Sequence, residues 1–559
     1  MTPSGGKDRG DPMDGRLIVD GERVETAAKL VSENPATLAP VGEVSLASRE
    51  LCDRAIAAAK AAYPDWRWLE PRAKRDIFRR AEAVLARRAE EAGRLIAAEK
   101  GSPYPESLAV EVFGALQSLN YYGHNQGRLL RPKRAGHHTP LFLNKSGEFH
   151  FHPLGPTLIV SPWNFPFLIP FCDTLSALTA GNTVVLRPSS STPLVALLIG
   201  EVFLEAGLPP GVLNVVVCRI PEAEGMIVHP DVQSVMFTGS VGIGKRVVEL
   251  CSRNLTNVTL ELGGKDPQIV LEDADLEKAA RGAVWTAFMN CGQSCGSIER
   301  VYVARPVAEA FTARVVELAR AVRVGDPLEP GVDMGPMATA GQLKVVEEHI
   351  ADARARGANV PVGGIRVAGR PGYFIEPTVL TGVDHSMLCM TEETFGPTLP
   401  IMAFDTDEEA VRLANDSVYG LTASVWTRDR RRAAWFAERL EAGSVTVNDH
   451  MYSFVEPRAI WGGIKQTGMG RSHGPYGLLE QVDIKYVGMD FFRKKAQTWW
   501  FPYDRSLEGI MEKAIAAFHG AGLGARLKAL WGLRTEWRRI LATAPLWNYV
   551  RALPRILKK

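Results

Sequence analysis

Three side chains in separate segments of this 559-residue chain have the chemistry needed for covalent attack on a carbonyl carbon. Cys295 becomes a strong nucleophile once a base or a lowered pKa supplies the thiolate. Glu261 is a candidate for that base, and the side-chain amide of Asn164 is a candidate donor to the resulting oxyanion. Each has an ordinary explanation when taken alone, because a lone cysteine is most often a small buried residue.

The order of the motifs removes that ordinary explanation. Between about Val31 and Tyr486 the chain resembles the NAD(P)-dependent aldehyde dehydrogenases. The resemblance rests on a series of motifs in the family's order: Asn34–Thr37, Pro162–Pro166, Gly181-Asn182, Phe237–Ser240, Glu261–Lys265, Gly292–Cys295, Gly325–Pro327, Glu392–Pro397 and Gly462–Lys465.

The resemblance implies a reaction in which Cys295 attacks an aldehyde to form a thiohemiacetal and then a thioester. Asn164 and the backbone N–H of Cys295 would stabilise the oxyanion. Glu261 would activate the water that releases a carboxylic acid, which favours hydrolysis over transfer to coenzyme A. A catalytically silent structural or binding protein on the same fold is the alternative of a different class, and the intact Cys295, Glu261, Asn164 and Glu393 argue against it.

A glycine-rich turn and several family positions point to a dinucleotide. The stretch Phe237–Gly244 follows a predicted strand and opens a predicted helix, where small residues let a pyrophosphate approach the helix N-terminus. Glu393 resembles the carboxylate that holds the nicotinamide ribose, with Phe395 against the ring. The full set of cofactor-binding candidates is Pro162, Trp163, Arg187, Ser190, Gly239, Ser240, Gly244, Leu262, Glu393 and Phe395.

The segment Arg187-Pro188-Ser189-Ser190 departs from many relatives, which have Lys-Pro-Ser-Glu here. A glutamate at the last position would repel a 2′-phosphate, and Ser190 does not. Arg187 offers a planar fork suited to phosphate. We therefore predict that NADP is preferred and that NAD is the alternative. The competing interpretation is that Arg187 only packs over the adenine.

The substrate cannot be fixed from the sequence. Aromatic side chains suit a lipophilic or aryl aldehyde, whereas Arg458 and the local text Cys295–Arg300 favour a semialdehyde, specifically NADP-linked succinate semialdehyde. Plain core positions are an equally good explanation of the aromatics. The substrate-lining candidates are Phe165, Phe288, Tyr452, Phe454, Arg458 and Trp461. Asp173 stands where many relatives have a lysine near the proton path, which leaves that relay in doubt.

The elements that must position these residues are strands alternating with helices. Short apolar runs such as Thr157–Val160 and Thr183–Leu186 alternate with helical segments from Leu154, and a second such region starts near Lys265. Alternation of this kind predicts open parallel α/β sheets. We therefore predict an α/β fold with two open parallel α/β domains, an active-site crevice between them, an oligomerisation flap and a helical C-terminal extension. Residues 50–100 are predicted to form surface helices.

Domain boundaries follow from the same reading. Residues 16–133 and 153–263 are predicted to form the dinucleotide-binding domain, and 264–462 the catalytic domain. By resemblance, 134–152 and 480–500 form the oligomerisation flap, so a homodimer or homotetramer is expected. Residues 1–15 are polar and are predicted to be a disordered leader without a secretory signal.

Composition excludes several classes. The sequence has no run of about 18 apolar residues, so no membrane-spanning helix is predicted. Seven cysteines without regular spacing favour a reducing cytoplasm over a disulfide framework. Cys291 and Cys295 lack the partners of a zinc site, so no metal is expected. A peroxide-induced link between these two thiols is a separate hypothesis.

The C-terminal residues 505–559 carry eleven Lys/Arg and three Glu, a net charge of +8 within a chain of net charge +2. Apolar residues recur there at helical spacing: Leu523, Leu527, Leu530, Trp531, Trp537, Ile540, Leu541 and Trp547. A basic amphipathic helix of this type is typical of an anionic membrane surface, and docking on the protein's own body is the equal alternative. We expect a cytoplasmic protein, peripheral on a membrane under the first alternative, with no nucleic-acid partner.

Overall fold

The computed structural model describes residues 14–136, 142, 145–490, 497, 499–501 and 503–536. The chain divides into two compact units, one of residues 1–129 and 153–483 and the other of residues 130–152 and 484–559. Most of the predicted leader and the tail beyond residue 536, including Trp537, Ile540, Leu541 and Trp547, lie outside the described residues.

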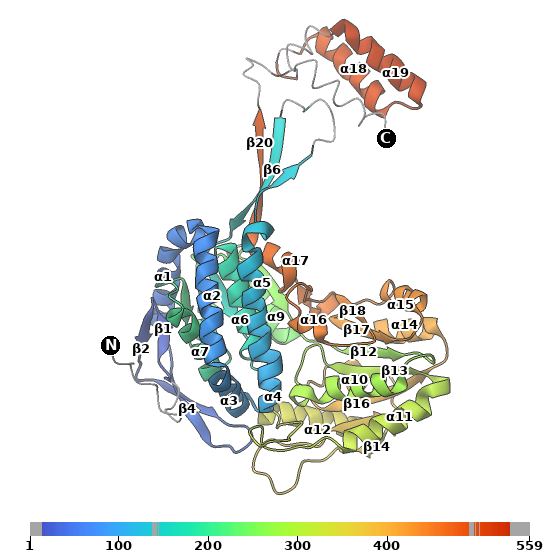
Figure 1. The fold of residues 1–559 in the computed structure, drawn as a ribbon. Helices are drawn as coiled ribbons and strands as arrows, with labels where there is room; N and C mark the ends of the chain where they lie inside the picture. Colours follow the sequence, from blue (N-terminus) through green and yellow to red (C-terminus); the bar gives the residue numbers. More distant parts are fainter. Residues whose placement is uncertain are drawn as a thin grey trace. The chain divides into compact units, whose positions relative to one another are not determined.

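The first unit contains an eight-stranded sheet of order β19-β11-β10-β7-β8-β9-β1-β2 (Figure 1). The five strands from β11 to β9 are parallel, and the edge strands β19, β1 and β2 are antiparallel. The strands are β1 (Leu17–Val19), β2 (Glu22–Val24), β7 (Thr157–Val160), β8 (Val184–Arg187), β9 (Leu213–Val215), β10 (Ser234–Thr238), β11 (Asn257–Glu261) and β19 (Gly468–Met469).

Helices cover this sheet, and a small hairpin of β3 (Lys29–Glu33) and β4 (Pro40–Ser45) adjoins it. The predicted helices between residues 50 and 100 are confirmed, and each buries one apolar face. α6 and α7 are apolar on all sides because they are sandwiched in the interior. The helices are α1 (Arg49–Trp68), α2 (Pro71–Arg87), α3 (Ala89–Lys100), α4 (Tyr104–Glu106), α5 (Phe113–Leu129), α6 (Leu168–Ala180), α7 (Pro193–Glu205), α8 (Ile220–Ile227) and α9 (Val241–Cys251).

A second, seven-stranded sheet has the order β14-β15-β16-β13-β12-β17-β18 and is parallel except at β14. Two apolar clusters on its strands and helices form its core. The strands are β12 (Asp266–Val270), β13 (Ile298–Ala304), β14 (Asn359–Val362), β15 (Thr378–Thr381), β16 (Thr398–Phe404), β17 (Thr422–Trp426) and β18 (Ser444–Val447). The helices are α10 (Leu276–Phe288), α11 (Arg305–Arg320), α12 (Ala340–Ala355), α13 (Leu388–Thr391), α14 (Asp407–Asn415), α15 (Arg430–Ala437) and α16 (Tyr452–Val455), whereas α17 (Gly474–Leu479) packs on α6 of the first sheet.

Two connections decide where chemistry can occur. The chain passes from the first sheet to the second between β11, which ends at Glu261, and β12. The connection from α10 to β13 carries Cys295. Glu261 lies at the carboxyl end of a strand of the first sheet, and Cys295 lies just before the amino end of a strand of the second. The two predicted parallel sheets are therefore confirmed, and the chain crosses between them where these two candidates lie.

The second unit contains a three-stranded antiparallel sheet and a pair of helices. The sheet has the order β20-β6-β5 and consists of β5 (Lys133–Ala135), β6 (Lys145–Pro153) and β20 (Val482–Asp490), which falls within the predicted flap. The helices are α18 (Arg505–His519) and α19 (Leu523–Gly532), followed by a short 3-10 turn. Among the described residues no helix is long and apolar enough to cross a membrane.

Candidate active site

A cavity of about 230 Å³ collects most of the predicted catalytic and cofactor residues. Cys295, Asn164, Glu393 and Phe395 line it together, although they lie up to 231 positions apart in the sequence. The lining residues are Pro162, Trp163, Asn164, Thr238, Gly239, Ser240, Leu262, Gly263, Cys295, Gln342, Val345, Glu393 and Phe395. Gln342 and Val345 come from α12 and were missed by sequence reasoning, because a single polar residue on an ordinary amphipathic helix gives no signal.

The loop before Cys295 is held in an unusual backbone conformation. Asn290 and Cys291 both have φ of 53°, a left-handed conformation that non-glycine residues adopt at a cost. Gly292 follows with φ of 71°, and a Cβ there would lie 2.2 Å from the carbonyl oxygen of Gly396, so only glycine fits. The loop is therefore fixed by its surroundings rather than by local preference.

Asn290 is the residue that ties this loop to its surroundings. Its backbone N–H donates to Glu106 Oε2 at 3.0 Å, and Lys100 Nζ donates to its carbonyl at 3.3 Å. Its side-chain Oδ1 accepts from Ser102 Oγ at 2.9 Å, while Nδ2 donates to the Asn164 carbonyl at 2.8 Å. No motif singled out Asn290, because these four partners lie more than a hundred residues away, although it also bonds to the nearby Gln293.

The thiol of Cys295 is surrounded by acids rather than by cations. Burial holds its pKa well above the ordinary value, and the charges of Glu261, Asp266 and Glu393 add to that effect. The thiol is therefore protonated at neutral pH in the resting protein, and a thiolate requires a base or an added positive charge.

Asn164 lies where an oxyanion donor is needed. It follows β7 directly and is buried, and its backbone carbonyl accepts the bond from Asn290. Its side-chain amide makes no hydrogen bond to any described residue, which leaves its N–H groups available to the cavity.

Glu261 is fully enclosed at the end of β11. Neither carboxylate oxygen has a hydrogen bond of ordinary geometry within the described chain, although Ser472 lies close by. Burial and then the charge of Asp173 raise the pKa of Glu261 to about 8, against a lowering effect of Ser472. A carboxyl group with such a pKa can act as a general base at mildly alkaline pH.

Asp173, on α6, is a buried acid that faces this region. Burial raises its pKa to about 7. A lysine at this position would lower the pKa of Glu261, whereas Asp173 raises it. The departure from the family pattern therefore changes the electrostatics around the candidate base.

The loop that carries Glu393 and Phe395 is anchored by a buried ion pair. Lys265 Nζ lies 2.6 Å from Glu299 Oε2, and the Glu299 carboxylate accepts the backbone N–H groups of Thr394 and Phe395. Phe395, with φ of 50°, packs edge-on against Trp163 with ring centroids 5.5 Å apart. Lys265 and Glu299, both buried, thus position two cofactor candidates.

Glu393 itself reaches the crossover between the sheets. Its Oε1 accepts the backbone N–H of Gly264 at 2.9 Å. A Cβ on Gly263 would lie 2.3 Å from Oε2, so the crossover must be glycine for the carboxylate to approach. Burial, followed by the charge of Glu299, raises the pKa of Glu393 to about 8.

The predicted glycine-rich turn has the geometry of an anion site. β10 ends at Thr238 and α9 begins at Val241, with Ser240 as an N-cap whose side chain makes no capping bond. A side chain at Gly244 would strike Leu262, so the helix packs closely on the crossover. Thr238, Gly239 and Ser240, which directly precede the first turn of α9, line the cavity.

Arg187 and Ser190 lie outside the lining of this cavity. Arg187 Nη2 donates to the carbonyl of Cys218 at 3.0 Å, and its buried Nε has no partner within the described chain. Ser190 is exposed.

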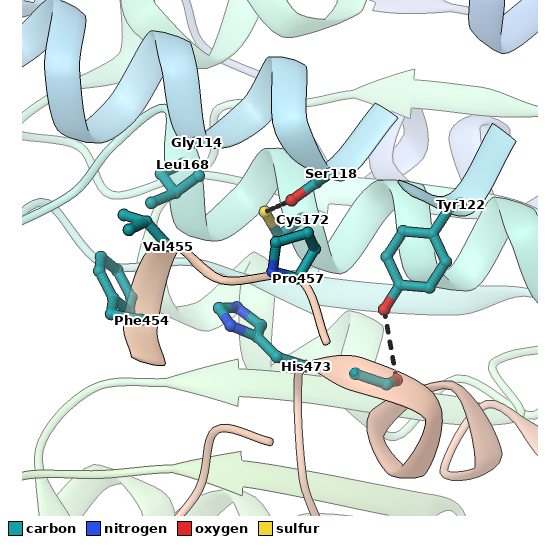
Figure 2. Close-up of a pocket in the computed structure, with 10 residues that line it drawn as sticks. Gly114, Ser118, Tyr122, Leu168, Cys172, Phe454, Val455, Pro457 and His473 are labelled. Carbon is teal, nitrogen blue, oxygen red and sulfur yellow. Dashed lines mark hydrogen bonds between the residues drawn. The ribbon is translucent and has the colours of Figure 1, made fainter. Parts of the chain in front are cut away.

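A second, much smaller pocket of about 10 Å³ shares no lining residue with the first. Figure 2 shows the residues that line it. Phe454, Val455 and Pro457 come from α16 and the segment after it, His473 lies beside them, and Ser118, Tyr122 and Cys172 come from α5 and α6. The Ser118 hydroxyl lies 3.3 Å from the Cys172 thiol, and the Tyr122 hydroxyl donates to the Gly474 carbonyl at 3.4 Å (Figure 2).

Three of the predicted substrate residues pack together, and one of them, Phe454, lines this pocket. The Phe454 ring lies 5.0 Å from Phe165, 4.9 Å from Trp461 and 5.9 Å from His473, measured between centroids. Trp461 packs against Gly296, the residue after Cys295, because a Cβ there would lie 2.8 Å from its ring. An aromatic wall therefore adjoins the candidate nucleophile.

The other three predicted substrate residues lie outside this aromatic cluster and line neither pocket. Phe288 packs in the core of the second sheet, since α10 turns that face inward. Tyr452 is 53% exposed, and Arg458 is exposed with its backbone N–H bonded to Glu456.

Cys291 is buried with its sulfur 3.5 Å from that of Met337, and burial raises its pKa to about 12. No group of residues that could hold a metal occurs in the described ranges.

Comparisons with known proteins agree with this geometry. Residues 23–487 match the family model described as the aldehyde dehydrogenase family. Betaine aldehyde dehydrogenase 1 of Rhizobium meliloti is 37% identical over 84% of this chain and 97% of its own length. The crystal structure of an E. coli NADP-dependent enzyme superposes with a TM-score of 0.82 at 33% identity, covering 86% of this chain and 98% of that one.

An NAD⁺ complex of an aldehyde dehydrogenase from Bacillus cereus is equally similar, with a TM-score of 0.82 and 33% identity over 86% of this chain and 97% of that one. The family uses a nicotinamide dinucleotide, NAD or NADP, and acts on aldehydes. The shared sheets and the match over most of the length leave one conclusion: this chain is a member of the aldehyde dehydrogenase family.

Proposed function

We propose that this enzyme oxidises an aldehyde to a carboxylic acid through a thioester on Cys295, with hydrolytic release. The observation that supports this most is the convergence of Cys295, Asn164 and Glu393 on one cavity beside the enclosed Glu261. The thiol can attack the carbonyl carbon, the amide can stabilise the oxyanion, and the carboxylate can activate water.

The first step is attack of the Cys295 sulfur on the aldehyde carbon. The thiol proton passes to solvent water rather than to Glu261, and the carbonyl oxygen becomes an anion that accepts from the Asn164 amide and the Cys295 backbone N–H. One donor of this type is worth about 3–4 kcal/mol in the transition state. The bond from Asn290 to the Asn164 carbonyl keeps that amide in place.

The residues present fit a nicotinamide dinucleotide. Gly263 leaves room for Glu393 at the cavity, Phe395 and Trp163 present rings to it, and α9 offers its N-terminus. When bound, the dinucleotide accepts the hydride that leaves the thiohemiacetal. Glu393 would hold its ribose, and the glycine-rich turn at Gly239 and Ser240 its pyrophosphate.

Glu261 completes the cycle. As a carboxylate it removes a proton from a water molecule, and the hydroxide oxygen attacks the thioester carbon; the bond between that carbon and Cys295 Sγ then breaks, which releases the carboxylic acid and returns Cys295 as the thiolate. The raised pKa of Glu261, about 8, means that this step becomes faster as pH rises towards that value.

We propose that NADP is preferred over NAD. Arg187 has a buried Nε without a protein partner, and the exposed Ser190 places no negative charge near a 2′-phosphate. The test is Ser190→Glu, with the kcat/KM ratio of NADP to NAD as the readout. The ratio should fall by at least about tenfold, and an unchanged ratio would refute the assignment.

For the substrate we propose an aldehyde whose distal end is apolar, aryl or cationic rather than carboxylate. The aromatic side chains of Phe165, Phe454 and Trp461 adjoin Cys295 through Gly296. The small pocket of Figure 2 beside them, with room for about one water molecule, has no Lys or Arg in its lining, and Arg458 does not line it. The buried Asp173 and Glu261 would repel a second carboxylate.

A cationic aldehyde is the specific second candidate. Aromatic faces around Phe454 can hold an ammonium group by cation–π attraction, and Asp173 supplies nearby negative charge. The similarity to a protein named betaine aldehyde dehydrogenase supports the same class.

The test of these proposals is a panel of hexanal, benzaldehyde, betaine aldehyde, 3-aminopropanal and succinate semialdehyde, assayed with NAD and with NADP for both reduced cofactor and carboxylic acid. We expect the acid as product and the lowest kcat/KM with succinate semialdehyde. A succinate semialdehyde preference would overturn the substrate proposal. Absence of any turnover would overturn the catalytic one.

We propose the roles of the parts as follows. Residues 16–133 and 153–263 bind the dinucleotide, and 264–462 carry the nucleophile. The antiparallel sheet of β5, β6 and β20, within 134–152 and 480–500, joins subunits into a dimer or tetramer in the cytoplasm. Light scattering of the purified chain tests the assembly, and a monomer would contradict it.

A further inference from the structure

The helix α19 has an apolar stripe that the described residues of its own unit do not cover. Leu523, Leu527 and Trp531 are spaced four residues apart, so they lie on one face. Their side chains are 64%, 48% and 67% exposed, and no residue of α19 is buried. The neighbouring α18, beside it in Figure 1, buries four of its apolar residues: Leu507, Ile510, Ala514 and Ala517.

Single exposed apolar residues are common, but a continuous stripe along a helix marks an interaction surface. Ile515 on α18 adds a further apolar side chain that is 63% exposed. Three side chains on a ten-residue helix offer far less than the roughly 800 Å² that each partner contributes to a standard protein interface. The stripe therefore suits a surface that needs only shallow insertion.

Charge determines the chemistry of that surface. Arg526, Lys528 and Arg534 accompany the stripe, and the Arg534 guanidinium lies over the Trp531 ring, 4.2 Å from its centroid. From residue 513 to the C-terminus the sequence contains ten Lys/Arg and a single acid, Glu536. Apolar residues flanked by cations, with Trp among them, are typical of helices that lie in the interface of an anionic bilayer.

We propose that α19 lies on the surface of an anionic membrane, with Leu523, Leu527 and Trp531 inserted at the boundary between headgroups and acyl chains. Arg526, Lys528 and Arg534 then contact the headgroup phosphates. The proposal does not depend on the aldehyde chemistry, because every residue that carries it lies beyond residues 23–487.

The test compares the full-length protein with Leu527→Glu/Trp531→Glu by cosedimentation with vesicles. One set contains phosphatidylcholine alone, and the other contains phosphatidylcholine with about one third phosphatidylglycerol. The wild type should bind only the anionic vesicles and be released by 0.5 M salt, because screening weakens headgroup attraction. The double variant should bind at least about tenfold more weakly.

The matched control is Leu255→Glu, which changes a leucine that is 91% exposed in the first unit. It should leave vesicle binding unchanged, and unaltered circular dichroism should show that each variant is folded. Equal partitioning of the wild type and the double variant would overturn the proposal. A lower oligomer mass of the double variant with unchanged vesicle binding would also overturn it, because the stripe would then contact a second copy of the chain.

Discussion

Replacing Asn290 with glycine separates the two tasks of this residue. Glycine adopts the left-handed backbone at φ of 53° without strain, so the bonds from Asn290 N–H to Glu106 and from Lys100 to its carbonyl can persist. Only the side-chain bonds are lost. The Asn164 carbonyl, buried at the oxyanion site, loses its donor at 2.8 Å.

The expected magnitudes follow from these contacts. A buried carbonyl left without a donor costs about 1–3 kcal/mol of stability, partly offset by relief of the left-handed strain. The catalytic loss cannot exceed that of removing the Asn164 amide itself, about 10²–10³ in rate. We expect Asn290→Gly to slow acylation by about 10- to 100-fold.

Acylation is measured as the rate of the pre-steady-state burst of reduced cofactor. If hydride transfer has become limiting, an aldehyde deuterated at the carbonyl carbon should show a larger isotope effect on kcat than in the wild type. Ser102→Ala is the matched control, because it removes the partner of Asn290 Oδ1 and leaves the bond to Asn164 intact. The rate of the burst of reduced cofactor in Ser102→Ala should be close to that of the wild type.

A double-mutant comparison decides whether Asn290 acts through Asn164. If it does, adding Asn290→Gly to Asn164→Ala should slow the burst no further. The reasoning would be refuted if the burst rate of Asn290→Gly lay within twofold of the wild-type rate. It would also be refuted if the double variant were slowed by the product of the two single-variant effects.

Three further predictions concern the charges around the nucleophile. Asp173→Asn removes a negative charge near Glu261 and lowers the pKa of that base, so the rising limb of the pH–kcat profile should move to lower pH, and a shift to higher pH would contradict the electrostatics. Alkylation of Cys295 by iodoacetamide in the protein without dinucleotide should still rise with pH above 9, because Glu261 and Glu393 oppose the thiolate, and a plateau near pH 7 would show that a cation has been overlooked. After mild peroxide, mass analysis should find Cys295 oxidised without a link to Cys291, since Cys291 is buried against Met337 whereas Cys295 lines the cavity; an observed link would support the disulfide hypothesis.

The positions of the two sheets could be predicted because local patterns specify them. Thr157–Val160 and Val235–Phe237 are short apolar runs bounded by polar breaks, and they form β7 and the centre of β10. The glycine-rich turn after β10 was recognisable for the same reason. These patterns depend on neighbours within a few residues, which a sequence displays directly.

What could not be predicted depends on contacts between distant segments. Asn290 reads as an ordinary polar residue until Ser102 and Asn164 are seen beside it. Phe288 is an aromatic residue of the type that contacts substrates, but it lies on the face of α10 that packs in the core of the second sheet. The effect of Asp173 on Glu261 also requires the fold, because 88 positions separate the two acids.

The most direct test of the central claim is mass analysis of Glu261→Gln after mixing with aldehyde and dinucleotide. Without the carboxylate no group activates water, whereas attack by Cys295 and hydride loss can still occur. The variant should release about one reduced cofactor per active site and then stop, with the acyl mass added at Cys295. Sustained turnover at the wild-type rate, or a burst without acylation of Cys295, would contradict hydrolytic catalysis through this thioester.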